Sequence, residues 1–138
     1  MPLPALQRVL PPVAVLLAAA GGCAVVLAAD PTTPGGVLPT CPTKLLFGIV
    51  CPGCGSLRMI YSLLHGRLGD ALHYNAVGLL AVAVLVPTWL LWTANRARGR
   101  PHRSWTTLRW APVVVLVITL AWFVVRNIPL APFTALRV

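Results

Sequence analysis

The sequence predicts an all-α integral membrane protein with three transmembrane helices and a short interfacial or re-entrant helical hairpin. Two features indicate the membrane: 58% of the 138 residues are apolar, whereas only 9% are charged. A soluble chain carries about a quarter charged residues, but a segment that spans a bilayer must be nearly free of charge. Three apolar stretches, at about residues 10–29, 76–94 and 110–126, are the candidate spans. We therefore expect a single membrane domain over residues 1–138.

The first span is expected at residues 10–29, a length that at about 1.5 Å per residue can cross a hydrocarbon core of about 30 Å. Pro11 and Pro12 are expected in its first turn, where proline removes no intrahelical hydrogen bond. Asp30 then ends the span. An alternative interpretation is a lipoprotein signal peptide cleaved before Cys23. The apolar run continues well beyond that cysteine, which favours a span over a signal peptide.

The segment 30–75 connects the first two spans and carries the hairpin. Residues 31–39 are rich in proline, glycine and threonine, which indicates a connection without a helix. The apolar run 44–50 is too short to span, so it is expected at the interface or dipping into the bilayer. After Gly55, apolar side chains recur at helical spacing, which predicts a short amphipathic helix on the membrane surface that Gly66 can cap.

The second span, residues 76–94, is expected to continue a helix that begins near Asp70, because a carboxylate stabilises a helix N-terminus. Pro87 is expected to kink this helix. The third span, residues 110–126, is the shortest, and Asn127 follows its end.

The loop 95–109 between the second and third spans is strongly basic. It holds five of the eleven basic residues in a chain of formal net charge +9: Arg96, Arg98, Arg100, Arg103 and Arg109. The positive-inside tendency accounts for this charge and places the loop in the cytoplasm, facing anionic headgroups, so no nucleic-acid partner is expected. With three spans, the N-terminus is also cytoplasmic, whereas the segment 30–75 and the C-terminus lie outside.

Three cysteines, Cys41, Cys51 and Cys54, lie in the segment 30–75 and mark the candidate site. Cys51 and Cys54 are expected at the start of a helix, whose positive end favours a thiolate. Arg58, one helical turn after Cys54, would add a cation on the same face. On the outer side of the membrane these thiols can be oxidised.

Zinc is one chemistry that suits this cluster, because three thiolates can occupy three corners of a metal tetrahedron. A fourth ligand is then needed, and the nominal candidates are His65, His73 and Cys23. Each has a geometric problem; on one continuous helix, for example, His65 would lie about 16 Å from Cys54. A water molecule can complete such a set instead.

Disulfide chemistry is the other interpretation, and the residues leave it open. A static disulfide would staple the outer segment. A redox-active pair would use Cys51 and Cys54, with Cys41 as a resolving thiol and Arg58 as the cation that stabilises the thiolate. With two acidic residues in the whole chain, acid–base hydrolysis and carboxylate-bound metals are not expected.

The chain resembles a bacterial membrane family known as domain of unknown function 2752. The resemblance covers about residues 40–129 and rests on these features: Cys41-Pro42, the block Cys51-Pro52-Gly53-Cys54-Gly55 with Arg58, the turn His65-Gly66, Asn75, and Arg126-Asn127-Ile128-Pro129. The family usually places proline after the asparagine, where this chain has Ala76. The resemblance implies an integral membrane fold with a shared cysteine site, and it implies no reaction.

These features predict a small accessory subunit of the bacterial inner membrane. In this interpretation zinc or a disulfide staples the cysteine segment, and the protein docks on a membrane protein partner or on a second copy of itself. The alternative is a membrane thiol-disulfide oxidoreductase that uses the Cys51 and Cys54 pair.

Overall fold

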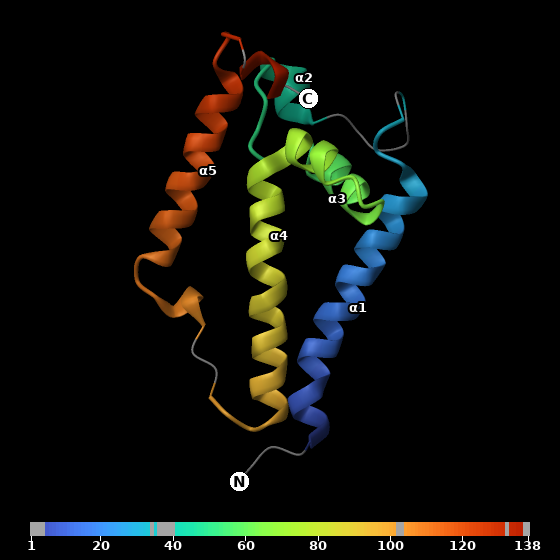
Figure 1. The fold of residues 1–138 in the computed structure, drawn as a ribbon, viewed down its shortest axis with the longest axis vertical. Coiled ribbons are helices and arrows are strands. Elements are labelled where there is room, and N and C mark those ends of the chain that lie inside the picture. Colours follow the sequence, from blue (N-terminus) through green and yellow to red (C-terminus); the bar gives the residue numbers. More distant parts are fainter. Residues whose placement is uncertain (1–4, 34, 36–40, 102–103, 132, 137–138) are drawn as a thin grey trace.

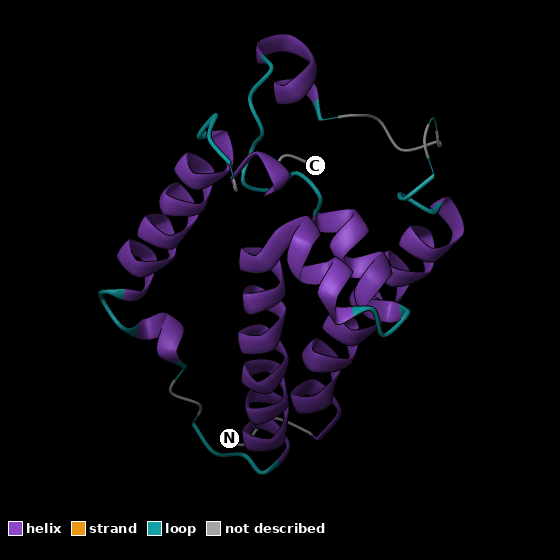
Figure 2. Ribbon diagram, turned by 45° about the horizontal axis from the view of Figure 1, so that its top comes forward, coloured by secondary structure: helices purple, strands orange, loops and turns teal. Residues whose placement is uncertain are grey.

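The computed structural model describes residues 5–33, 35, 41–101, 104–131 and 133–136, and these fold as helices joined by turns and loops (Figures 1 and 2). The elements are α1 (Ala5–Ala29), α2 (Pro42–Phe47), α3 (Ser56–Leu64), α4 (Leu68–Ala97), the 3₁₀ helix η1 (Trp105–Thr107), α5 (Ala111–Asn127) and the 3₁₀ helix η2 (Phe133–Leu136). No strand occurs in these ranges, so the predicted all-α class is confirmed. Part of the segment 31–39, expected as a connection without a helix, lies outside the described residues.

Two of the helices are long and apolar enough to cross a membrane. They cover Gln7–Ala29 in α1 and Leu68–Ala97 in α4, and they include the first two predicted spans. The third apolar stretch forms α5, which has 17 residues and is shorter. Apolar side chains along all three helices are largely exposed, as helices that face lipid require.

α1 and α4 run antiparallel, and the start of α1 meets the end of α4 (Figure 1). The indole Nε1 of Trp89 donates to the carbonyl of Pro12 at 3.3 Å, and Nε of Arg96 donates to the carbonyl of Arg8 at 2.8 Å. The helix begins at Ala5, earlier than expected, so Pro11 and Pro12 lie inside it and not in its first turn. Both contacts fix the basic end of α4 against the N-terminal half of α1.

α3 packs against α4 and near the far end of α1, where it buries Met59 and Ser62 (Figures 1 and 2). The helix ends at Leu64, and Gly66 caps it as predicted, with a φ of 72° in the left-handed conformation that glycine accepts readily. The amide of Gly66 donates to the carbonyl of Leu63, and the amide of Arg67 donates to that of Ser62. These two bonds form a Schellman motif, which turns the chain directly into α4.

α4 is interrupted at Asn75, whose backbone (φ −162°, ψ 89°) is not helical. The kink predicted at Pro87 concerns a position further along α4, and the break at Asn75 was not predicted. Asn75 acts as an N-cap for the longer part of the helix, because its Oδ1 accepts a hydrogen bond from the amide of Gly78 at 2.8 Å. The Asn75 side chain thus supplies a partner for an amide that the break leaves without a helical hydrogen bond, which lowers the energetic cost of the break.

α5 returns along the molecule, so that its end reaches the same side as α2 and α3 (Figure 1). The linking helix η1 is held to α4 by the indole Nε1 of Trp105, which donates to Oγ1 of Thr88 at 2.9 Å. The molecule thus has two ends: one carries the start of α1 and the end of α4, and the other carries α2, α3 and the end of α5 (Figures 1 and 2).

A Gly78→Ala substitution tests the capped break in α4. A Cβ at this position would lie 2.9 Å from Cε of Met59 and 3.1 Å from Cγ of Asn75, so one of these side chains must move. We expect the free energy of unfolding to fall by about 1–3 kcal/mol, as for other overpacked buried sites. Denaturant unfolding in detergent micelles measures this change.

Gly69→Ala in the same helix is the matched control. A Cβ there meets nothing within 4 Å, so alanine is expected to stabilise the helix by up to about 1 kcal/mol. Equal effects of the two substitutions would contradict the packing that we describe around Asn75.

Candidate functional site

The candidate site is the turn that joins α2 to α3. The amide of Cys54 donates to the carbonyl of Cys51 at 3.1 Å, and the amide of Ser56 donates to that of Gly53 at 3.1 Å, which closes two consecutive turns. Gly55, the N-cap residue of α3, follows with a φ of 81°, a conformation that favours glycine. The two cysteines therefore lie directly before the helix, whereas the sequence placed them in its first residues.

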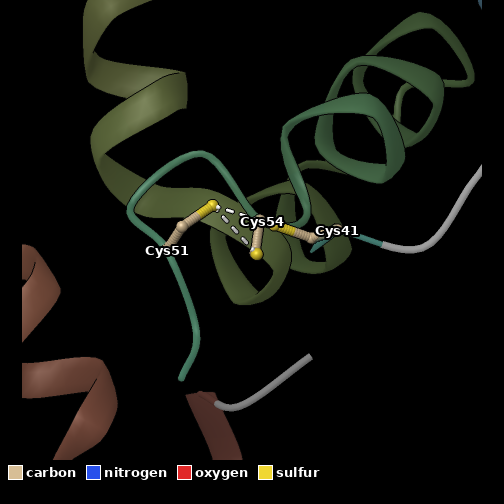
Figure 3. Close-up of side chains that lie close together, drawn as sticks. All are labelled: Cys41, Cys51 and Cys54. Carbon is tan, nitrogen blue, oxygen red and sulfur yellow. Dashed lines mark hydrogen bonds between the residues drawn. The ribbon is translucent and has the colours of Figure 1, made fainter. Parts of the chain in front are cut away.

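The three predicted cysteines come together at one point (Figure 3). The Sγ atoms of Cys51 and Cys54 are 3.0 Å apart, those of Cys41 and Cys51 are 3.4 Å apart, and all three lie within 4.8 Å of one another. Cys41 reaches the cluster from the position that precedes α2. Cys41 and Cys51 are partly exposed, whereas Cys54 is buried.

This spacing suits a metal ion that prefers sulfur. With zinc–sulfur bonds of about 2.3 Å, two sulfurs on a zinc tetrahedron are about 3.8 Å apart. The observed separations of 3.0 and 3.4 Å require only small side-chain movements to reach that value. All four cysteines of the chain are free thiols in this structure, and a disulfide requires a sulfur separation of about 2.05 Å. The same thiols are close enough to form a disulfide after a modest approach.

Asn75 supports the cysteine turn from α4. Its carboxamide nitrogen donates to the carbonyl of Pro52 at 3.0 Å and to Oγ of Ser56 at 2.9 Å. The side chain is 2% exposed, and its oxygen caps α4 as described above. One buried carboxamide thus connects the break in α4 with both sides of the cysteine turn.

Asn127, at the end of α5, holds the residue that precedes Cys51. Its Oδ1 accepts from the amide of Val50 at 3.1 Å, and its Nδ2 donates to the carbonyl of the same residue at 2.9 Å. Both backbone groups of Val50, which is 3% exposed, are therefore satisfied by one side chain. This pairing imitates one rung of a β-ladder and fixes the direction from which the chain enters the turn.

Arg126 is the cation beside the cysteine turn, and its side chain is fully buried. Its Nη1 donates to the carbonyl of Cys54 at 2.7 Å and lies 3.4 Å from that of Cys51, while Nε donates to the carbonyl of Leu136 at 3.0 Å. The sequence located the motif Arg126-Asn127 but assigned it to the end of the third span. The available signal was the position of Arg126 in the last turn of an apolar helix, where a buried charge is costly.

Arg58, the predicted cation of the site, has other contacts. Its Nε donates to the carbonyl of Pro31 at 2.9 Å, and its guanidinium lies 6.0 Å from the ring centre of Tyr74. It therefore ties α3 to the chain that follows α1. Arg126 occupies the position beside the thiols that was expected for Arg58.

The other candidate ligands lie outside the sulfur cluster. Nδ1 of His65 is 2.8 Å from the carbonyl of Tyr61, and the ring of His73 packs edge-on against Tyr74. Cys23 lies within α1. Among the described residues that could bind a metal, the group that converges consists of Cys41, Cys51 and Cys54.

The thiols differ in acidity. The hydroxyl of Thr43, whose Oγ1 lies 3.5 Å from Sγ of Cys41, lowers the pKa of Cys41 to about 6, with further contributions from the neighbouring thiols. Burial raises the pKa of Cys54 to about 12, and the adjacent sulfurs add to this effect. Metal-free protein at neutral pH therefore carries a thiolate at Cys41 and a neutral thiol at Cys54.

Comparison with known families gives one match, and it includes the cysteine site. Residues 41–89 match the family "Protein of unknown function (DUF2752)". This match confirms the resemblance inferred from the cysteine motif. The matched DUF2752 region includes the three cysteines, α3 and the break at Asn75, whereas Arg126 and Asn127 follow it. No curated protein and no solved structure matches the chain.

Alkylation of the metal-free protein tests the order of thiol acidity. The thiolate is the reactive form, and its fraction rises as the pH rises through the pKa. Cys41 is therefore expected to react half-maximally near pH 6, while Cys54 stays unreactive at neutral pH. Iodoacetamide labelling over a range of pH, read by peptide mass spectrometry, measures both residues.

Thr43→Val should move the Cys41 profile to higher pH, because the hydroxyl that stabilises the thiolate is lost. Thr43→Ser, which keeps a hydroxyl, is the control and should retain most of the low pKa. Faster labelling of Cys54 than of Cys41 at pH 7 would contradict this assignment.

Proposed function

We propose that this protein is a small three-span membrane protein in which Cys41, Cys51 and Cys54 bind zinc. The convergence of the three sulfur atoms within 4.8 Å carries this proposal. Thiolates are preferred zinc ligands, and a structural zinc ion contributes directly to folding free energy. In this role the ion would staple α2 and the following loop to the start of α3.

The zinc staple has a structural purpose in this fold. α2 is six residues long, and its apolar side chains are largely exposed: Leu45, Leu46 and Phe47. A helix of this length is not stable alone. Because Cys41 precedes α2 and Cys51 follows it, binding both to one ion closes the segment into a loop of fixed shape.

We also propose that α5 is the third transmembrane span and that the protein has a defined orientation in the membrane. The single domain has spans at about residues 10–29, 76–94 and 110–126, and the arginine-rich loop 95–109 faces the bacterial cytoplasm. The opposite ends of the molecule carry that loop and the cysteine turn (Figure 1), which supports an outer location for the cysteines. The expected role is that of an accessory subunit of the inner membrane.

A membrane partner or a second copy is the proposed binding target. Added Cβ atoms at Gly21 and Gly22 in α1 would meet nothing within 4 Å, so this part of the helix is open to another helix. Small residues allow helix backbones to approach closely in lipid. We therefore expect the partner to be a transmembrane helix that packs against this surface of α1.

A thiol-disulfide oxidoreductase is the second candidate, and the acidity difference between the thiols favours it. The Cys41 thiolate would attack a substrate disulfide and form a mixed disulfide. Cys51, 3.4 Å away, would then displace the second substrate sulfur. The products are a Cys41–Cys51 disulfide and two substrate thiols, so two electrons pass to the substrate. In this mechanism Cys41 supplies the attacking thiolate, a role that the sequence assigned to the pair Cys51 and Cys54.

Metal content and free-thiol count on the detergent-purified protein distinguish the two functions. We expect about one zinc per chain, as for a single tetrahedral site. Cys51→Ser should remove the zinc and lower the amount of folded protein, whereas Cys23→Ser, outside the cluster, should retain both. Metal-free protein with a Cys51-dependent disulfide that opens reversibly under mild reductant would contradict the zinc staple and support the oxidoreductase.

Membrane sidedness is tested with cysteines introduced at the two ends. Arg100→Cys should react with a membrane-impermeant maleimide only after cells are permeabilised, because its loop is cytoplasmic. Thr33→Cys, at the opposite end, should react in intact cells. Peptide mapping separates these labels from the native cysteines, and labelling of Arg100→Cys from outside would overturn the orientation.

A further inference from the structure

The number of metal ligands that the chain can supply is limited by its composition. It contains four cysteines, three histidines and two acidic residues. A closed structural zinc site uses four such side chains, whereas a site with three keeps one position for an external ligand. Of the candidates in the described residues, three sulfurs converge.

The remaining candidates in the described residues lie outside the sulfur cluster, and three of them have contacts elsewhere. The carboxylate of Asp30 accepts a hydrogen bond from the amide of Thr32 at 3.1 Å, and that of Asp70 lies 3.8 Å from Nε of Arg67. His65 contacts the backbone of its own helix, as described above. A fourth ligand from this group would require rearrangement of α1, α3 or α4.

The cluster is accessible from one side. Cys54 is 7% exposed and lies at the buried side, where Arg126 contacts its carbonyl at 2.7 Å. Cys41 and Cys51 are partly exposed and so form the accessible side of the cluster. An external ligand can therefore approach past these two residues while the buried side remains closed.

The surroundings favour a thiolate as that ligand. The described cluster contains no histidine or carboxylate that could take a proton from a metal-bound water, as a hydrolytic zinc site requires. Zinc with three thiolates carries a net charge of −1. The positive guanidinium of Arg126 beside the turn offsets added negative charge, and sulfur is a ligand that zinc accepts readily.

We propose that the metallated cysteine site binds the thiolate of an external molecule as its fourth ligand. This inference rests on the proposed zinc function. In the binding step an external thiol forms a metal–sulfur bond, its proton passes to solvent, and the water in the fourth position leaves. No oxidation occurs, so the step is freely reversible. The site would thus recognise a thiol, either a small molecule or a cysteine of a partner.

Cobalt substitution tests this proposal in the full-length protein, because Co²⁺ reports its ligands through its absorption spectrum. The probe thiol is 2-mercaptoethanol, and the chain carries Cys23→Ser so that it holds no fourth cysteine. We expect the sulfur-to-cobalt charge-transfer band to grow by about one third on saturation, from three sulfur ligands to four. The d–d bands should shift at the same time, and 2-mercaptoethanol should be released on gel filtration.

Two results would overturn the proposal. Co²⁺ that binds but shows no spectral response to saturating 2-mercaptoethanol would leave the metal site intact and reject the external thiolate. A spectrum of four protein ligands before any thiol is added, such as three sulfurs and a histidine nitrogen, would show that the position is already filled. Failure of the folded protein to bind Co²⁺ or Zn²⁺ would instead reject the metal function itself.

Cys41→Ser is the matched variant for the same titration. It removes one ligand at the partly exposed side and leaves the buried Cys54 in place. We expect weaker cobalt binding and, before any thiol is added, a charge-transfer band smaller than that of the parent protein. An unchanged spectrum before thiol addition would show that Cys41 is no ligand, which contradicts the three-thiolate site.

Discussion

The hydrogen bonds from Asn75, Arg126 and Asn127 to the backbone of the cysteine turn are the interactions on which the rest of the site depends. The turn is neither helix nor strand, so its carbonyls and amides have few partners of their own. Buried polar groups without partners cost several kcal/mol each in an apolar environment. Side chains from α4 and α5 supply those partners. The positions of the sulfur atoms are therefore determined by two helices that carry none of them.

This dependence also explains how α5 is attached. Between its ends α5 stands apart from α4 (Figure 1), and its apolar side chains are largely exposed. In lipid, apolar surfaces gain little by meeting each other, so polar contacts and close packing hold helices together. Hydrogen bonds hold α5 to the rest of the molecule near its two ends: Arg126 and Asn127 bond to the cysteine segment at one end, and Trp105 of the preceding η1 bonds to α4 at the other. The same bonds that order the cysteine turn thus anchor the third apolar helix.

Hydrophobic patterning and local turn chemistry were sufficient to predict the helices. The apolar stretches, the helix after Gly55 and its end at Gly66 depend on nearby residues, and the structure has them where the sequence indicated. The break at Asn75 was not predicted, because it depends on contacts with Met59 and with the cysteine turn. Arg58 and Arg126 could not be distinguished by spacing, since the cation near the thiols comes from a residue 72 positions away. Contacts between residues so far apart in the sequence depend on the tertiary fold, which spacing alone does not reveal.

The buried guanidinium of Arg126 bears on the choice between zinc and a disulfide. Burial of a charge is costly unless an opposite charge or strong hydrogen bonds compensate it. Three thiolates with a zinc ion form a centre of net charge −1 next to the turn whose carbonyls Arg126 contacts. A disulfide between two of the cysteines is neutral and leaves at most one thiolate. In the proposed zinc site the negative charge beside Arg126 is fixed by the ion and its three thiolates, whereas in the disulfide state it depends on the ionisation of the single remaining thiol. This difference supports the proposed zinc site over the disulfide.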